Sequence, residues 1–171
     1  FREFLEILNK YRKPVAAYLA DTGILGPRTT LGHMAITGGH SRVDYPRGDE
    51  LKFLAGAGAA SGHCPHKCAK MAFAMESFEQ YLSAGVRIGL GTDTYPHNML
   101  DEMRLVAYLA RTQANDPRCM STTELFDAAT IGGAKALGRE DIGRLAAGCR
   151  ADFVLVDVTH PMMRPARDPV R

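Results

Sequence analysis

Short apolar runs alternate with amphipathic stretches along this chain. Three runs, at residues 29–32, 59–62 and 86–90, are bounded by glycine or polar residues and predict β-strands, although the second is poor in branched residues. Apolar residues at helical spacing predict helices around them. These helices are expected at residues 1–11, 15–20, 49–57, 73–83 and 98–113. Strands that alternate with helices favour an α/β fold with a parallel sheet.

The C-terminal third is predicted to be helical first and extended afterwards. Ser121-Thr122-Thr123-Glu124 has the form of a capping box, which opens a helix. Gly132-Gly133 interrupts the periodicity, and a short helix is expected to follow as far as Leu137. Gly148 begins a turn into an apolar strand at residues 153–158.

Each of the three N-terminal strands is followed closely by a side chain that can bind a metal. His33, His63 and Asp93 are 30 residues apart, and a strand-to-helix unit takes about 30 residues. One repeating unit therefore delivers all three to the same rim of a parallel sheet, where α/β proteins place their chemistry. We expect three adjacent parallel strands with helices on one side. A single His or Asp at a strand end is ordinarily structural, but three in one phase indicate a site.

Composition and charge narrow the classes of function. The 171 residues are 46% hydrophobic and 23% charged, with a net charge of +2, as is usual for a globular domain. This charge is too small and too mixed to indicate nucleic acid. The chain has no apolar run of about 18 residues and no visible signal peptide. We expect a cytoplasmic protein without a nucleic-acid or membrane partner.

The four cysteines do not have the spacing of a small disulfide-stapled domain. Two of them lie in the segment His63–Cys68, which holds two histidines and two cysteines within six residues. Such ligands suit zinc, so a small structural zinc site is one hypothesis for this segment. The other is a loop that directs His63 into a pocket and packs its cysteines as small apolar residues.

An ordered set of segments resembles the C-terminal part of amidohydrolase-superfamily enzymes, in the branch of cytosine deaminase, adenosylhomocysteine deaminase and chlorohydrolases. The set covers most of residues 25–158 in the family's order, and together the segments are far more specific than any one of them. The matching segments are Leu31-Gly32-His33, His63-Cys64-Pro65, Ala84 to Asp93, Glu102-Met103-Arg104, Ala129 to Gly138 and Ile142 to Val156.

The resemblance implies a partial TIM-like (β/α)8 barrel, comprising about strands 6 to 8 with their helices, and the start of a C-terminal β-sandwich strand. Residues 1–140 would be the barrel part, and residues 141–171 would lead into the incomplete β-sandwich domain. A complete barrel takes about 250 residues. The family's His-x-His pair on strand 1 and its His on strand 5 have no counterpart here. We therefore expect a fragment that is inactive in isolation.

The resemblance also assigns roles to the candidate site residues. It implies that Asp93 is a metal ligand and the general acid/base, and that His33 polarises the substrate, although in binuclear relatives the matching His binds metal. His63 is expected to contact substrate. His97 either lines the mouth of the pocket or is an exposed loop residue.

Several other polar residues receive structural interpretations. Glu76 either faces a polar group of the substrate or is an ordinary helix residue. Glu102 and Arg104 are expected to form ion pairs behind the site, while His40 and His160 are expected at the surface.

The preferred function is hydrolytic deamination or dechlorination of an N-heterocyclic or related C–N substrate by metal-activated water. The expected cofactor is a divalent metal, zinc first and iron or manganese otherwise, with an incomplete ligand set in this chain. The expected partner is a small-molecule substrate, and the full-length parent is expected to be a homo-oligomer. The alternatives are a non-catalytic amidohydrolase-like scaffold or binding protein, and the zinc-binding module at His63–Cys68.

Overall fold

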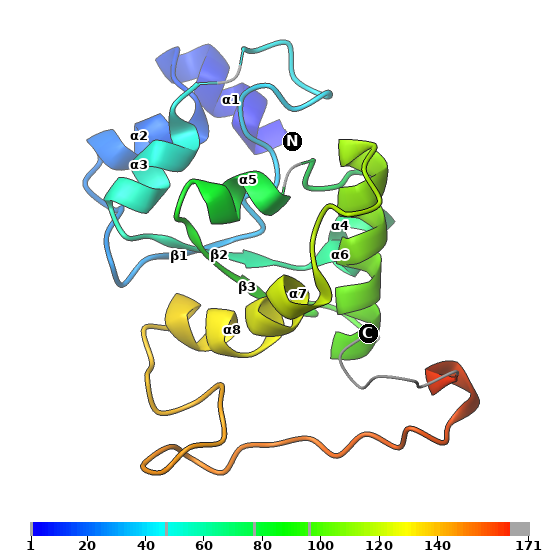
Figure 1. Cartoon of the computed structure of the whole chain (residues 1–171). Coiled ribbons are helices and arrows are strands. Elements are labelled where there is room, and N and C mark those ends of the chain that lie inside the picture. Colours follow the sequence, from blue (N-terminus) through cyan, green and yellow to red (C-terminus); the bar gives the residue numbers. More distant parts are fainter. Residues whose placement is uncertain (1, 47, 77, 96, 165–171) are drawn as a thin grey trace.

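A computed structural model describes residues 2–46, 48–76, 78–95 and 97–164 and has a three-stranded parallel sheet at its centre (Figure 1). The strands are β1 (Thr30–Gly32), β2 (Ala60–His63) and β3 (Arg87–Leu90), in the order β1-β2-β3. Their register aligns Gly32 with Gly62 and Gly62 with Gly89. The predicted positions of the strands, their adjacency and their parallel direction are confirmed.

Eight α-helices and one 3-10 helix lie within the described residues. They are α1 (Arg2–Tyr11), α2 (Val15–Asp21), α3 (Glu50–Gly56), α4 (Pro65–Lys70), α5 (Phe78–Ser83), α6 (Met99–Ala114), α7 (Thr122–Ala129), α8 (Ile131–Ala136) and η1 (Pro161–Met163). The capping box at Ser121 is confirmed, because its side chain and that of Glu124 each bond to the other residue's backbone N–H. The first predicted helix included Phe1, which lies outside the described residues.

Two differences in the middle of the chain concern α4 and α5. Most of the segment His63–Cys68, expected as a loop, belongs to α4, which has Pro65 at its first position, where a helix needs no N–H donor. The helix predicted over residues 73–83 begins only at Phe78, and Ser77 lies outside the described residues. Ala72 takes a left-handed conformation after α4, and the Glu76 carboxylate bonds to Ser41. The segment between the helices therefore packs as a loop.

Helices cover both faces of the sheet, so the prediction of helices on one side was wrong. Leu54 of α3 and Phe78 and Tyr81 of α5 share a buried core with Ile88 of β3. The neighbouring Gly89 faces α8 on the opposite side, where a Cβ atom at Gly89 would meet Gly133 Cα at 2.8 Å. The glycine pair that was expected to precede this helix lies inside it. Its missing side chains let the helix backbone lie directly against the strand.

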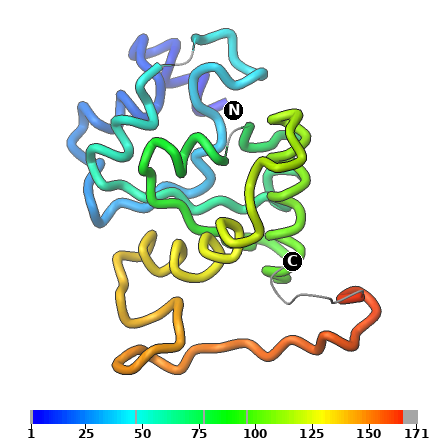
Figure 2. Tube along the Cα trace, in the orientation of Figure 1, coloured from blue at the N-terminus to red at the C-terminus, as the bar shows by residue number. Residues whose placement is uncertain are grey.

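The apolar strand predicted at residues 153–158 does not form in the described part of the chain. This segment runs extended, apart from the helices that cover the sheet (Figure 2). Val154 and Leu155 are 85% and 87% exposed. The segment has the composition of a strand, but a strand also needs a hydrogen-bonded neighbour, and the described residues supply none. Among the helices of the described residues, none combines the length and apolar character that crossing a membrane requires.

Candidate active site at the carboxyl ends of the strands

His33 and Asp93 come together at the rim where the strands end. The Nε2 atom of His33 lies 3.3 Å from Oδ2 of Asp93, and the two side chains are 30% and 35% exposed. They follow β1 and β3, which are separated by β2, so both side chains reach across the end of the middle strand. The structure thus brings together the two residues to which the sequence assigned the chemistry.

Both residues occupy unusual three-residue turns. His33 has φ 66° and Asp93 has φ 55°, in the left-handed region that side chains other than glycine rarely adopt. Met34 N–H donates to the Gly32 carbonyl at 2.9 Å, and Thr94 N–H donates to the Thr92 carbonyl at 2.6 Å. A hydrogen bond across two residues with a positive φ between them is the rarer and more strained form of the γ-turn. Strain of this kind concentrates at functional sites.

Lys67 is a third member of the site, and the sequence analysis did not single it out. Its Nζ lies 3.7 Å from Asp93 Oδ2, and its side chain is 31% exposed. Because the segment His63–Cys68 was expected as a loop, nothing indicated where this lysine would point. A short helix led by Pro65 turns it toward the rim.

The surroundings of His33 favour its neutral form. Partial burial lowers its pKa below the usual value, the charge of Lys67 lowers it further, and Asp93 opposes both effects. At neutral pH the imidazole therefore has one nitrogen free of a proton. Such a ring can accept a hydrogen bond or coordinate a metal.

His63 lies behind the rim rather than on it. The side chain is 2% exposed, and its ring centre is 5.7 Å from that of Phe78. Burial, and secondarily the nearby His33, lowers the pKa of His63 to about 3. Its Nδ1 atom is buried without a hydrogen-bond partner. The predicted contact of His63 with substrate stays a prediction, and its position is deeper than expected.

His97 is exposed and lies beside the Asp93 turn. Its Nδ1 is 3.1 Å from the hydroxyl oxygen of Thr92, the residue before Asp93. This place is compatible with both interpretations of the residue, as part of the pocket mouth or as a surface histidine.

Both residues that were expected to form ion pairs behind the site have close polar partners. The fully buried Glu102 accepts a bond from the His66 backbone N–H at 3.0 Å and lies 3.1 Å from that residue's ring Nδ1. Arg104 pairs with Asp101 at 3.1 Å. Glu102 thus ties α6 to the start of α4, the helix that carries Lys67.

One of the two expected surface histidines is buried. His40 is 5% exposed, and its Nε2 lies 3.0 Å from the Ala74 carbonyl, so the surface assignment was wrong. The glycine-rich loop that carries it folds back onto the segment before α5, which sequence patterning does not reveal. Glu76 also belongs to this contact, through its bonds to Ser41. His160 is exposed, as expected.

The described residues do not complete a metal site. His33 and Asp93 are ligand types that suit zinc, but no group of three or more His, Cys, Asp or Glu side chains is placed to hold an ion in this part of the molecule. The hypothesis of a zinc module at His63–Cys68 was therefore wrong. Burial is the main cause that raises the pKa of the Cys64 and Cys68 thiols to about 11, as expected for cysteines that pack as small apolar residues.

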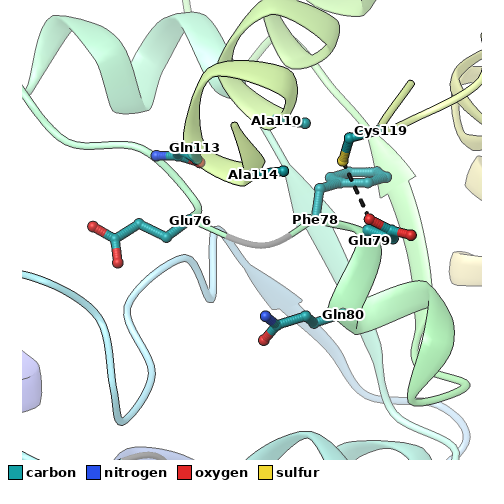
Figure 3. A pocket seen from close by; sticks show the side chains of 8 residues that line it. All are labelled: Glu76, Phe78, Glu79, Gln80, Ala110, Gln113, Ala114 and Cys119. Atoms are coloured by element: carbon teal, nitrogen blue, oxygen red, sulfur yellow. Dashed lines mark hydrogen bonds between the residues drawn. The ribbon is translucent and has the colours of Figure 1, made fainter. Parts of the chain in front are cut away.

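One pocket lies away from these residues. It has a volume of about 430 Å³ and lies between α5 and the end of α6 (Figure 3). Phe78 and Glu79 line it together with Cys119, whose thiol donates to a Glu79 carboxylate oxygen at 3.2 Å. Neither His33 nor Asp93 is among its lining residues, so it is separate from the candidate active site.

Comparison with known proteins places the chain in a family. The model of the amidohydrolase family matches residues 16–170. The chain belongs to the amidohydrolase family. This amidohydrolase chain is 37% identical over 171 residues to the 5-methylthioadenosine/S-adenosylhomocysteine deaminase of Nitratidesulfovibrio vulgaris strain DP4. The match covers 98% of this chain and 37% of that protein.

Solved amidohydrolase structures have the same fold over nearly all of the chain. A Xanthomonas campestris adenosine deaminase with bound zinc gives a TM-score of 0.82 at 28% identity, covering 99% of this chain and 38% of that one. The zinc complex of atrazine chlorohydrolase from Arthrobacter aurescens TC1 gives a TM-score of 0.79 at 26% identity. The match covers 98% of this chain and 36% of that one. The chain thus spans a little over a third of the length of these proteins.

Proposed function

We propose that this chain is part of a metal-dependent amidohydrolase that hydrolyses the C–N bond of an amino-substituted N-heterocycle, releasing ammonia. The observation that carries the proposal is the contact of His33 Nε2 with Asp93 Oδ2 at 3.3 Å, on strained turns at the carboxyl rim. The relative from Nitratidesulfovibrio vulgaris, named as an adenosine-type deaminase, supports this substrate class.

The fold supports a place for the chain within a barrel. We assign the three strands to about strands 6 to 8 of a (β/α)8 barrel, residues 1–140 to its C-terminal part, and residues 141–171 to the lead into a small β-sandwich. A Cβ atom built on Gly32 or Gly62 would meet nothing within 4 Å. α8 covers this face at Gly89, and the part beside β1 and β2 that it leaves open would line the interior of a closed barrel. The full-length protein would be a cytoplasmic homo-oligomer.

Asp93 and His33 have distinct chemical tasks in this proposal. Asp93 would be one ligand of a divalent metal, zinc by preference and iron or manganese otherwise, which when bound supplies an activated water at neutral pH. The Asp93 carboxylate takes up a proton and returns it to the leaving amine. His33, neutral at pH 7, faces the substrate or the metal. Lys67 balances the charge of Asp93 while no substrate is present.

The decisive test is Asp93→Asn in the full-length protein. The amide cannot carry the proton, so we expect kcat for ammonia release to fall by about 10² to 10⁴. The substrates to assay are 5'-methylthioadenosine, S-adenosylhomocysteine and 5'-deoxyadenosine. His33→Asn should also be severe, although bound metal is retained if His33 acts on substrate. Turnover close to normal in Asp93→Asn would refute the role of the carboxylate.

Dechlorination is the second candidate, because a chlorohydrolase structure matches this chain with a TM-score of 0.79. Chloride release from atrazine, without ammonia release from the adenosine derivatives, would favour it. A stable full-length protein that binds these molecules but converts none would instead favour the scaffold hypothesis. The isolated 171-residue chain should be inactive and bind zinc weakly, which a zinc titration checks.

A further inference from the structure

The two strained turns are held in different ways. The Asp93 turn is supported near the surface, where the Thr92 hydroxyl contacts His97. The His33 turn is supported from inside the protein, because the Tyr81 hydroxyl donates a hydrogen bond to the carbonyl oxygen of Met34. Met34 is the residue whose N–H closes the turn around His33. The phenol therefore fixes the peptide that leaves the turn.

Tyr81 is buried at a position where a tyrosine that only filled space would be unfavourable, because its hydroxyl needs a hydrogen-bond partner. It is 1% exposed, in the core shared by α5 and the sheet. A buried hydroxyl without a hydrogen bond destabilises the fold, whereas phenylalanine would fill nearly the same volume without needing a partner. Burial raises the pKa of Tyr81, so the phenol keeps its proton and remains a donor.

The strand end explains why such support is needed. The hydrogen-bond ladder of β1 ends at His33, whose backbone N–H donates to the Gly62 carbonyl at 2.8 Å. Beyond this bond the chain passes through His33, whose left-handed backbone is strained and persists only where the surroundings hold it in place. A change in the His33 backbone would swing its ring away from Asp93. The bond to the Met34 carbonyl lies on the other side of the turn and completes its fixation.

We infer that Tyr81 is a positioning residue that holds the imidazole of His33 toward Asp93 through the carbonyl of Met34. The inference rests on the proposed function for its catalytic consequence, but its structural content stands apart from any activity. Tyr81 itself does not touch the reacting atoms.

Tyr81→Phe tests the inference, with Thr30→Val as the matched control. The Thr30 hydroxyl also donates to a backbone carbonyl, that of Ala136 at 2.8 Å, but from the opposite end of β1. Each variant loses one hydroxyl-to-carbonyl bond. In the ¹⁵N-labelled chain, Tyr81→Phe should shift the ring signals of His33 and speed exchange of the Met34 amide by about tenfold or more. Thr30→Val should leave both unchanged.

Kinetics of the full-length protein supply the second readout. Misplacing His33 should lower kcat by about tenfold in Tyr81→Phe and change KM by less than about twofold, whereas Thr30→Val keeps kcat within about twofold. Unchanged His33 signals and Met34 exchange in Tyr81→Phe would overturn the inference whatever the kinetics. If the His33 signals move but Asp93→Asn has normal turnover, the proposed function fails and the positioning role stands.

A pair of unnatural residues keeps the test decisive if Tyr81→Phe does not fold. para-Methylphenylalanine at position 81 preserves the bulk of tyrosine without a donor, and para-aminophenylalanine preserves an N–H donor. The amino variant should restore the His33 signals that the methyl variant disturbs. Equal behaviour of the two would count against a role for the hydrogen bond.

Discussion

The two rims of the sheet are built on opposite principles. At the amino-terminal rim, the Arg87 guanidinium donates to three backbone carbonyls, those of Pro27, Gly58 and Lys135, and the Thr30 hydroxyl donates to a fourth. These bonds tie β1, β2 and β3 to α8 and to the loops before the strands. Each of these four carbonyls receives a side-chain donor, although the Nε atom of the same guanidinium is buried without a hydrogen-bond partner.

The carboxyl rim leaves its polar atoms unsatisfied. The Nδ1 atoms of His33 and His63 are buried without hydrogen-bond partners, and both His33 and Asp93 take left-handed backbone conformations. Buried atoms without partners and strained turns lower stability, and they persist where a ligand is to be bound. The contrast teaches that one end of the strands stabilises the fold and that the other carries the strained turns of the proposed active site.

The largest effect we expect at the carboxyl rim is a loss of stability in acid that depends on His63. Its pKa is about 3 when folded and about 6.5 when unfolded, so the unfolded chain binds the proton first. The contribution of His63 to the free energy of unfolding is fully present above pH 6.5 and is lost as the pH falls toward 3. It amounts to roughly 3 kcal/mol between pH 7 and pH 4.

Urea denaturation at several pH values measures this dependence. His63→Gln should flatten it, and Thr30→Val, which removes no titrating group, should not. An equally steep dependence in His63→Gln would show that another group controls acid stability.

A smaller effect is expected from Arg87→Met at the amino-terminal rim. Methionine keeps an apolar stem but donates no hydrogen bond, so the free energy of unfolding should fall by about 2 kcal/mol. The NMR signals of His33 should not move. Arg118→Met is the control, because the Arg118 side chain is 88% exposed and pairs only with the nearby Asp116 among the contacts of the described residues. A shift of the His33 signals in Arg87→Met would break the separation of the two rims.

The smallest effect distinguishes the covered part of the sheet from its open part. Gly89→Ala should lower the free energy of unfolding by about 1 to 2 kcal/mol, since its Cβ atom would meet Gly133 Cα at 2.8 Å. Gly62→Ala, in the same register row, should change it by less than about 0.5 kcal/mol because that side is open. Thermal denaturation of the two variants checks the pair. Equal losses of unfolding free energy in the two variants would mean that α8 does not pack closely against β3.

The sequence predicted the features that recur with a regular spacing. It could not predict the side-chain positions that depend on contacts between distant residues. The spacing of 30 residues between His33, His63 and Asp93 located three strands and the rim where His33 meets Asp93. Lys67 was missed because its direction depends on a six-residue helix that has hardly any periodicity. Tyr81 acts on Met34, 47 residues earlier, and no local pattern records that bond.

Two failures have the same physical origin. The glycines of α8 lower helix propensity, yet the helix forms because only glycine allows such close contact with β3. The apolar segment at residues 153–158 has strand propensity, yet it forms no strand because no described segment pairs with it. In the first case a packing partner overrides the local preference, and in the second the lack of a partner does so.

The left-handed turns also restrict how this rim can evolve. At positions 33 and 93 the backbone tolerates glycine, asparagine, aspartate and histidine far better than the branched residues. Of these four, aspartate and histidine are the ones that readily exchange protons. Random drift at either position is therefore channelled toward a few side chains, and a lineage that lost the chemistry could recover it by single substitutions at an unchanged backbone.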